Sequence, residues 1–300
     1  MEADINMNKV LVIVGPTGVG KTSFSIDLAK TYNSEIISGD SIQIYKGLDI
    51  GSGKIKEEEK QGIIHHLINI KEANENYSVK EFQELGRKKI EDIIKENKLP
   101  IVVGGTGLYI KALLYDYTFF DEDKEDDQFI NMSNIEIYKE IEKKDPKALL
   151  NTHVNNRKRL VRALNILKKH NTGISSIKDK QNHKPIYDIK IIGLTKEKEE
   201  LINLVDKRID EMINDGLIDE IKELLNKGIT FNNQSMQGIG YKEFKGYFDN
   251  TKSLDECIKD VKTHTHQFIK RQYTWFKNQM NVEWYTDINK AKESIKKWYE

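Results

Sequence analysis

The sequence has almost no cysteine, no excess of one charge and no long apolar run, and each absence excludes a class of protein. A single cysteine, Cys257, stands among 300 residues, which excludes an internal disulfide and a cysteine-based zinc site. Basic and acidic residues number 48 each, so no uniform positive field is available for nucleic acid. No window approaches the roughly 20 apolar residues that span a bilayer. The segment MEADINMNK also lacks the apolar stretch of a signal peptide, and we expect a cytoplasmic protein without membrane association.

The shorter apolar runs indicate a parallel sheet surrounded by helices. Val10 to Val14 is a continuous apolar run, mostly β-branched, which is typical of a buried parallel strand. Similar runs predict further strands over 34–38, 99–103 and 188–194. Helical spacing of apolar residues predicts helices over 22–32 and 79–97. This alternation predicts a doubly wound α/β core.

The strand pattern is interrupted in the middle of the chain. An acidic cluster, DEDKEDD at 121–127, is followed by helical stretches without strands up to about Lys184. Strand character returns with IKIIGL, and the chain then reads as helices to its end. We therefore predict a core with C-terminal helices that covers 1–116 and 186–300. A helical insertion domain over 117–185 interrupts this core.

A complete phosphate-binding pattern directly follows the first predicted strand. It reads Gly15, Pro16, Thr17, Gly18, Val19, Gly20, Lys21 and Thr22. Its small residues let backbone amides turn toward an anion, and the following helix adds its positive end. Lys21 offers an ammonium group and Thr22 a hydroxyl suited to Mg²⁺. This P-loop predicts a diphosphate site, but it leaves a nucleotide kinase, a nucleotide-hydrolysing switch and a transferase with a diphosphate leaving group open.

Two further polar groups follow predicted strands. Asp40 comes after the second strand, and ligands bind at the carboxyl ends of strands in open α/β sheets. There Asp40 is suited to holding Mg²⁺ or to acting as a general base, and a helix N-cap is an equally supported alternative. Thr106 lies in the glycine-rich turn Gly104–Gly107 after the third strand. That turn either admits a ligand closely or is only a tight connection to a helix.

Several segments, taken together, resemble a known family. In order they read GPTGVGKT, DSIQIYKGLDIGSGK, HHLI, VGGTGLYIKALL, NRKRLVRAL, MQGIGYKEF and KRQYTWFK. This combination is similar to the tRNA dimethylallyltransferase (tRNA isopentenyltransferase) family from about Val10 to about Trp284. The resemblance implies transfer of a dimethylallyl group from dimethylallyl diphosphate to the exocyclic amine of the adenosine 3′ to the anticodon, with release of diphosphate.

The resemblance also implies a role for each matching position. Lys21 and the loop amides of 15–22 would hold the diphosphate, and Thr22 would bind the Mg²⁺. Asp40 would accept the amine proton, and Thr106 would position the amine or the reacting centre. The implied tRNA contacts are Asp40, Ser41, Ile42, Gln43, Lys158, Arg159, Leu160, Val161 and Arg162.

The implied chemistry agrees with these residue types. An aryl amine is a poor nucleophile, so a carboxylate beside it helps by taking its proton. Because an allylic carbon readily bears positive charge, the main barrier is departure of the diphosphate, which amides, Lys21 and Mg²⁺ favour. Arg208, in VDKRIDEM, matches a recurrent family arginine and would add to this diphosphate site. A charge on a solvated helix surface is an equally supported alternative for Arg208.

Two basic stretches are candidates for an RNA surface. One covers 157–162 together with Lys168, Lys169 and His170. The other contains Lys262, His264, His266, Lys270, Arg271 and Lys277, interleaved with Phe268, Tyr273 and Trp275. Such a mixture suits phosphate contacts and base stacking, although solvated helix faces with core aromatics are the simpler alternative. The resemblance favours contact with the tRNA anticodon stem-loop, with the insertion domain taking part. We infer no obligate protein partner and expect a monomer.

Three rival functions stay open at this point. A small-molecule kinase would share the core and the Mg²⁺ site, and an adenylate isopentenyltransferase would use the same donor on a free nucleotide. A non-enzymatic RNA-binding module leaves the P-loop and Asp40 unexplained. The segments GIGYKEF and KRQYTWF favour a tRNA acceptor. The sequence departs from the family at Ile55, where proline is common, at His266, where arginine is frequent, and in its short acidic insertion.

Overall fold

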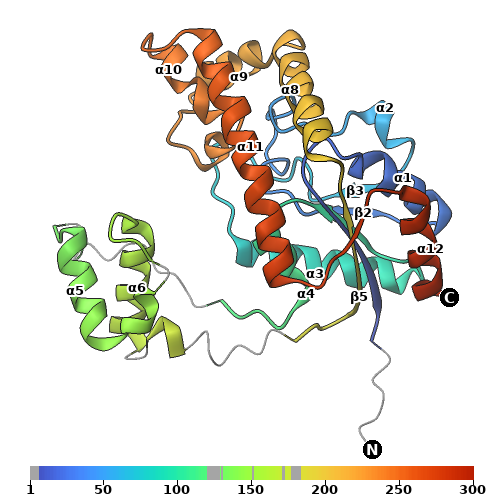
Figure 1. Cartoon of the computed structure of the whole chain (residues 1–300), viewed down its shortest axis with the longest axis horizontal. Coiled ribbons are helices and arrows are strands. Elements are labelled where there is room, and N and C mark those ends of the chain that lie inside the picture. Colours follow the sequence, from blue (N-terminus) through green and yellow to red (C-terminus); the bar gives the residue numbers. More distant parts are fainter. Residues whose placement is uncertain (1–6, 120–128, 130, 151, 171–172, 177–183) are drawn as a thin grey trace, which may run out of the picture. The chain divides into compact units, whose positions relative to one another are not determined.

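The chain forms two compact units (Figure 1). The first consists of Met1–Tyr115 with Pro185–Glu300, and the second of Asp116–Lys184. This computed structural model describes residues 7–119, 129, 131–150, 152–170, 173–176 and 184–300. The acidic cluster 121–127 therefore lies outside the described residues. No helix within the described ranges combines the length and the apolar character needed to cross a membrane.

The first unit is built on a parallel sheet, which confirms the predicted α/β class. Its described strands lie in the order β3 (His65–His66), β2 (Ile36–Ser38), β4 (Ile101–Gly104), β1 (Lys9–Val14), β5 (Asp188–Leu194) and β6 (Glu283–Tyr285). Every neighbouring pair is parallel, and Val12 of β1 lies opposite Val102 and Ile191. Residues Val10–Val14 are all fully buried, although successive side chains of a strand face opposite sides. Both faces of β1 are therefore covered.

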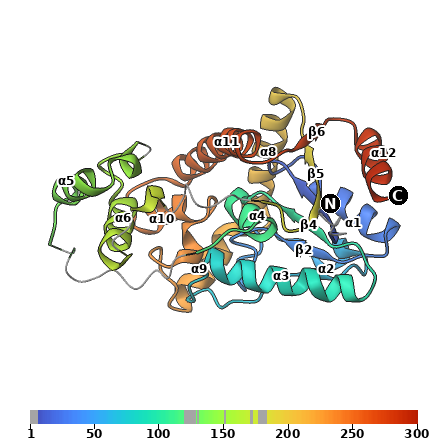
Figure 2. The same ribbon diagram turned by 90° about the horizontal axis from the view of Figure 1, so that it is seen from below.

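Helices connect these strands and flank the sheet (Figure 2). Those before β5 are α1 (Lys21–Thr31), α2 (Glu57–Lys60), α3 (Val79–Lys95) and α4 (Gly107–Leu114). Those after it are α8 (Lys198–Asn214), α9 (Leu217–Asn226), α10 (Lys245–Phe248), α11 (Leu254–Gln279) and α12 (Ile288–Tyr299), with the 3-10 turns η3 (Gln234–Gln237) and η4 (Lys242–Phe244). The long α11 begins with a capping box in which Ser253 and Glu256 each accept the other's backbone N–H.

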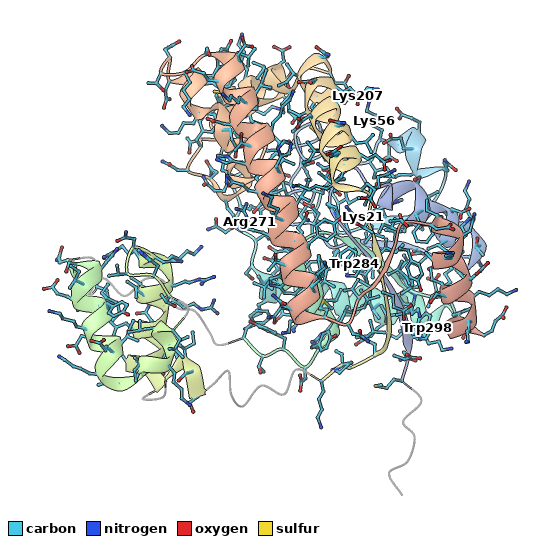
Figure 3. All side chains as sticks on the ribbon, viewed as in Figure 1. Lys21, Lys56, Lys207, Arg271, Trp284 and Trp298 are labelled. Carbon is cyan, nitrogen blue, oxygen red and sulfur yellow. The ribbon has the colours of Figure 1, made fainter. Side chains whose placement is uncertain are left out.

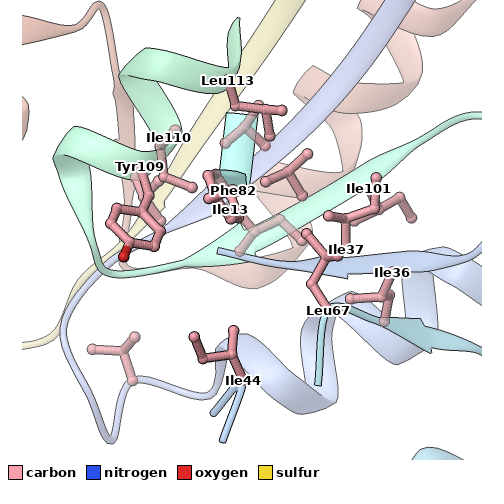
Figure 4. Close-up of a cluster of buried hydrophobic side chains, with 14 of the residues drawn as sticks. Ile13, Ile36, Ile37, Ile44, Leu67, Phe82, Ile101, Tyr109, Ile110 and Leu113 are labelled. Atoms are coloured by element: carbon pink, nitrogen blue, oxygen red, sulfur yellow. The ribbon is translucent and has the colours of Figure 1, made fainter. Parts of the chain in front are cut away.

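The hydrophobic core of the first unit joins the sheet to α3 and α4 (Figure 4). Ile13, Ile37 and Ile101 of the sheet are fully buried, as are Phe82 of α3 and Leu113 of α4. Each such side chain removed from water stabilises the fold by about 1.5–3 kcal/mol. This packing fixes the carboxyl ends of β2 and β4, where the polar residues of the candidate site follow.

The second unit has a hydrophobic core of its own. Its described elements are α5 (Asn134–Lys144), η2 (Pro146–Leu149) and α6 (Arg157–His170), and its described residues include no strand. Ile137 and Ile141 of α5 pack with Leu160 and Leu164 of α6. Arg157 donates to the carbonyls of Met132 and Phe129, both at 2.7 Å, and so fixes the start of α6.

Two short strands, β3 and β6, were not predicted. The region after residue 195 was expected to be wholly helical, and this is wrong at β6, which pairs with β5. Trp284 lies opposite Gly193, and a Cβ at Gly193 would come within 2.5 Å of the indole ring. Strands of two or three residues are too short to show an alternating pattern of apolar residues. They form because they pair with strands that are distant in the sequence, which no local pattern indicates.

Candidate active site

The predicted P-loop connects the end of β1 to the start of α1. Its glycines have positive φ values, 142° at Gly15, 82° at Gly18 and 92° at Gly20. Residues other than glycine rarely adopt such backbone angles. At Gly15 a Cβ would also lie 2.5 Å from the carbonyl oxygen of Leu194. Gly20 is the N-cap of α1, so the positive end of that helix faces the loop.

Lys21 folds back over this loop. Its Nζ donates to the carbonyl of Pro16 at 2.6 Å. Burial, followed by the positive charge of Arg208, lowers the pKa of Lys21 from 10.5 to about 8, while the carboxylate of Asp40 acts in the opposite direction. Arg208 and Asp40 thus lie close enough to Lys21 to influence its charge. The mutual repulsion of the cations favours binding of an anion between them.

Arg208, from α8, faces the P-loop and is not a solvated helix charge. Its Nη1 donates to Oγ1 of Thr17 at 3.4 Å and its Nη2 to the carbonyl of Gly53 at 3.3 Å. Gly53 has a φ of 57°, and a Cβ there would collide with the guanidinium group. Burial lowers the pKa of Arg208 from its ordinary value, yet an arginine remains charged. The structure therefore adds a fixed cation to the loop.

Asp40 follows β2 and closes a turn with one of its oxygens. Its Oδ1 accepts the backbone N–H groups of Ile42 at 2.8 Å and Gln43 at 3.2 Å. Within the described part of the chain, its Oδ2 has no hydrogen-bond partner. No helix begins directly after Asp40, since the next helix is α2, so the predicted N-cap alternative is wrong. The two bonds close a turn, which orients the carboxylate. Because one oxygen is held and the other is open, Asp40 retains a group that is able to accept a proton.

Thr106 begins α4, but its hydroxyl does not cap that helix. The flanking glycines are approached by α11: Gln272 Nε2 donates to the carbonyl of Gly105 at 3.0 Å, and a Cβ at Gly107 would collide with the ring of Trp275. A Cβ at Gly105 would lie 3.7 Å from the carbonyl oxygen of Gly15, so this turn adjoins the P-loop. The glycines are therefore required by helix packing, and the Thr106 hydroxyl stays available.

Gln272 is a residue of the site that sequence reasoning missed. It is only 6% exposed, and its Oε1 is buried with no hydrogen-bond partner among the described residues. Its position inside KRQYTWFK was visible in the sequence. Nothing local indicated that its amide would reach the turn before Thr106, because the two are far apart along the chain.

The other predicted contacts divide between the two units. Ser41, Ile42 and Gln43 are half-buried beside Asp40, and Gln43 Nε2 donates to the carbonyls of Ser52 at 3.3 Å and Gly53 at 3.4 Å. The structure thus brings the P-loop, Arg208 and the segment 40–43 together within the first unit.

The remaining predicted contacts lie on α6, in the second unit. Lys158, Arg159 and Arg162 are exposed there. Leu160 and Val161 are 0% and 3% exposed in the core of that unit, which corrects the predicted set. Because helical spacing turns these two inward, their side chains are not available to RNA.

The second basic stretch, on α11, is largely paired within the protein. Lys262 contacts Asp210 at 2.8 Å, and His266 contacts Asp206 at 2.7 Å. His264 likewise contacts the buried Glu243, at 2.8 Å. The other cations of this stretch, Lys270, Arg271 and Lys277, are exposed. Arg271, labelled in Figure 3, lies over the ring of Phe268. Tyr273 and Trp275 pack against the core, as the simpler alternative stated.

The residues that the structure describes contain no group of three or more histidine, cysteine or acidic side chains suited to a metal ion. Thr22 is exposed at the first turn of α1, and Asp40 is half-buried nearby in the site. Both are hard oxygen donors. One or two protein oxygens are what Mg²⁺ uses when phosphate oxygens and water complete its shell. The donor set therefore fits Mg²⁺ carried with a diphosphate.

The fold and the site define an α/β protein with P-loop geometry at the end of its central strand. A family model described as IPP transferase matches residues 43–279. A tRNA dimethylallyltransferase of Anoxybacillus flavithermus is 47% identical over 282 residues, which cover 92% of this chain and 90% of the relative. The chain belongs to the tRNA dimethylallyltransferase family.

Solved structures agree with this assignment. A tRNA delta(2)-isopentenylpyrophosphate transferase of Staphylococcus epidermidis superposes with a TM-score of 0.73 at 38% identity, covering 97% of this chain and 99% of the other. A eukaryotic dimethylallyltransferase, solved in a study of its action on tRNA, superposes with a TM-score of 0.83 at 32% identity. Here 94% of this chain and 75% of the other are covered.

Proposed function

We propose that this protein transfers a dimethylallyl group from dimethylallyl diphosphate to the exocyclic amine of the adenosine 3′ to the anticodon of tRNA, releasing diphosphate. One observation carries the proposal: the P-loop, its two cations and the carboxylate of Asp40 meet in one unit of a chain from this family. An anion site beside a proton acceptor is what a diphosphate leaving group and an amine nucleophile require.

The donor diphosphate is held by the P-loop. The loop N–H groups within 15–20, of which Pro16 contributes none, would bind its oxygens, while Lys21 and Arg208 neutralise its charge. Thr22 would hold a Mg²⁺ ion, which when bound withdraws charge from the departing diphosphate. These groups act most strongly when the C–O bond breaks, because the leaving group then gains charge.

The acceptor amine is activated from the other side. Asp40 takes the amine proton on its open oxygen while its Oδ1 stays bound to the backbone of Ile42 and Gln43. The hydroxyl of Thr106 positions the amine against the allylic carbon. The new C–N bond forms as the C–O bond to the diphosphate breaks, and the proton leaves on Asp40. The target adenosine must leave its base stack to reach this site.

The tRNA is bound through both units. In the first unit the half-buried Ser41, Ile42 and Gln43 lie next to the proton acceptor, and in the second unit Lys158, Arg159 and Arg162 are exposed on α6. Such arginines and lysines contact the RNA backbone, which adds affinity and a dependence on salt.

We expect the salt dependence of tRNA binding to become weaker in the double variant Arg159→Ala with Arg162→Ala. Each phosphate contact that is lost reduces the number of counterions released when tRNA binds. The slope of log affinity against log salt should therefore fall in magnitude by roughly 1–2. Filter-binding titrations at several salt concentrations measure it. Lys292→Ala with Lys296→Ala, on α12, removes the same charge as a control, and an unchanged slope in the arginine variant would show that this face of α6 does not bind tRNA.

Donor capture should depend on pH through Lys21. The pKa of Lys21 is lowered to about 8, so the ammonium is present below that pH and lost above it. Only the charged form attracts a diphosphate, and kcat/KM for the donor should therefore fall as pH rises through about 8. A profile from pH 6.5 to 9.5 tests this, and a flat profile would contradict it.

Acceptor choice is tested by incubating the protein with Mg²⁺, labelled dimethylallyl diphosphate and either unmodified tRNA or AMP. Label should enter tRNA and not AMP. Transfer to AMP alone would identify an adenylate isopentenyltransferase. ATP turnover with small acceptors, and no transfer of label, would identify a kinase.

A further inference from the structure

A loop beside the candidate site is held by a carboxylate from a distant helix. Glu220 of α9 accepts three successive backbone N–H groups, from Asp49 at 2.9 Å, Ile50 at 2.7 Å and Gly51 at 3.2 Å. Successive amides directed at one anion form a backbone anion site. Here the anion is a side chain of the protein itself, so the contact fixes the loop.

Tyr241 completes this contact. Its ring is fully buried, and its hydroxyl donates to Glu220 Oε1 at 2.7 Å and accepts the N–H of Ser52 at 3.1 Å. Burial, together with the negative charge of Glu220, raises the pKa of Tyr241 well above its ordinary value, so the hydroxyl keeps its proton. A Cβ at Gly51 would lie 2.6 Å from the ring, which explains the glycine there. We refer to Glu220 and Tyr241 as the loop clamp.

The clamped loop leads directly to the donor site. Gly53 follows Ser52, and its carbonyl accepts from Arg208 Nη2 at 3.3 Å and from Gln43 Nε2 at 3.4 Å. Arg208 also donates to Thr17 of the P-loop. The direction of one carbonyl therefore helps to orient both the second cation of the diphosphate site and the segment that carries Asp40.

We propose that Glu220 and Tyr241 are positioning residues that fix the Gly53 carbonyl and thereby direct Arg208 at the donor diphosphate. Neither residue touches the donor. A free arginine side chain has many rotamers, and ordering it only on binding would weaken the affinity. The clamp keeps Arg208 ordered in advance. This inference rests on the proposed function, in which Arg208 binds the diphosphate.

Two variants test the clamp. Glu220→Gln replaces one acceptor oxygen by an N–H₂ group that opposes the backbone amides, and Tyr241→Phe removes only the hydroxyl. In each, we expect the KM for dimethylallyl diphosphate and the Kd for inorganic diphosphate with Mg²⁺ to rise about 10-fold, because the side chain of Arg208 is then ordered only on binding. The KM for tRNA should not change. Glu256→Gln, which alters a carboxylate that caps α11 away from this loop, is the matched control.

A double-mutant cycle separates positioning from simple stability. In an Arg208→Ala background, Tyr241→Phe should have no further effect on diphosphate binding, because the two act through one contact. Additive effects, or a lower melting temperature with unchanged diphosphate binding, would overturn the clamp. If Glu220→Gln fails to fold, Tyr241→Phe still decides. If Arg208→Ala itself leaves diphosphate binding unchanged, the proposed role of Arg208 is wrong; if it weakens binding and the clamp variants do not, only the clamp is wrong.

Discussion

Lys21→Ala should lower the transfer rate by roughly 10²–10³-fold, the effect of removing one preorganised charge partner from a developing anion. Lys21 is the P-loop ammonium, its Nζ lies 2.6 Å from the Pro16 carbonyl, and it shares the site with Arg208. Its loss weakens donor binding and, more importantly, removes a positive charge that stabilises the growing negative charge of the departing diphosphate.

Steady-state rates at saturating donor separate these two effects. Lys30→Ala is the matched control, because Lys30 lies in the last turn of the same helix and bonds to Gln61 at 2.6 Å. The control should keep its rate. A near-native rate for Lys21→Ala at saturating donor would show that the P-loop lysine does not act on the leaving group.

Asp40→Asn should reduce the catalytic rate by roughly 10²–10⁴-fold, the range for a positioned acid–base group. Asparagine keeps an oxygen that accepts the N–H groups of Ile42 and Gln43, so the turn after β2 should survive. It loses the negative charge and the basicity. Donor binding should change little, since Lys21 and the loop amides hold the diphosphate.

Single-turnover rates across Mg²⁺ concentrations distinguish three roles of Asp40. A low rate at every concentration identifies the general base. A rate that recovers at high Mg²⁺ identifies a metal partner, with the proton going to water or to the diphosphate. An unchanged rate would mean that Asp40 only stabilises the turn after β2.

The central part of the fold was predictable because its signals are local. The run Val10–Val14 fills a strand buried on both faces, and the glycine spacing after it fits one loop geometry. The position of Asp40 followed from the rule that strand ends share one edge of a parallel sheet. The strand and the loop need only the order of residues within one βα unit, and Asp40 needs only the strand that comes next.

Other features depend on partners far along the chain and have no local signal. Gly105 and Gly107 are small because Gln272 and Trp275 of α11 pack on them. Glu220 bonds to backbone amides, which every residue possesses, so no sequence pattern marks its partners.

The buried pair on α6 is a different case. Leu160 and Val161, with Leu164, form an apolar face at helical spacing, and this was readable in the sequence. The prediction took the whole stretch 158–162 from the family as RNA contacts, and so did not take that periodicity into account. Resemblance places a segment, whereas burial decides which of its side chains are available.

The most direct test of the proposed activity is nucleoside analysis of the tRNA after reaction. The protein, Mg²⁺ and dimethylallyl diphosphate are incubated with two transcripts that differ only in having adenosine or guanosine 3′ to the anticodon, and the digests are compared by mass spectrometry. We expect dimethylallyl adenosine from the first transcript alone, with one diphosphate released per modified nucleoside. Equal modification of both transcripts, or diphosphate release without any modified adenosine, would contradict the proposed activity.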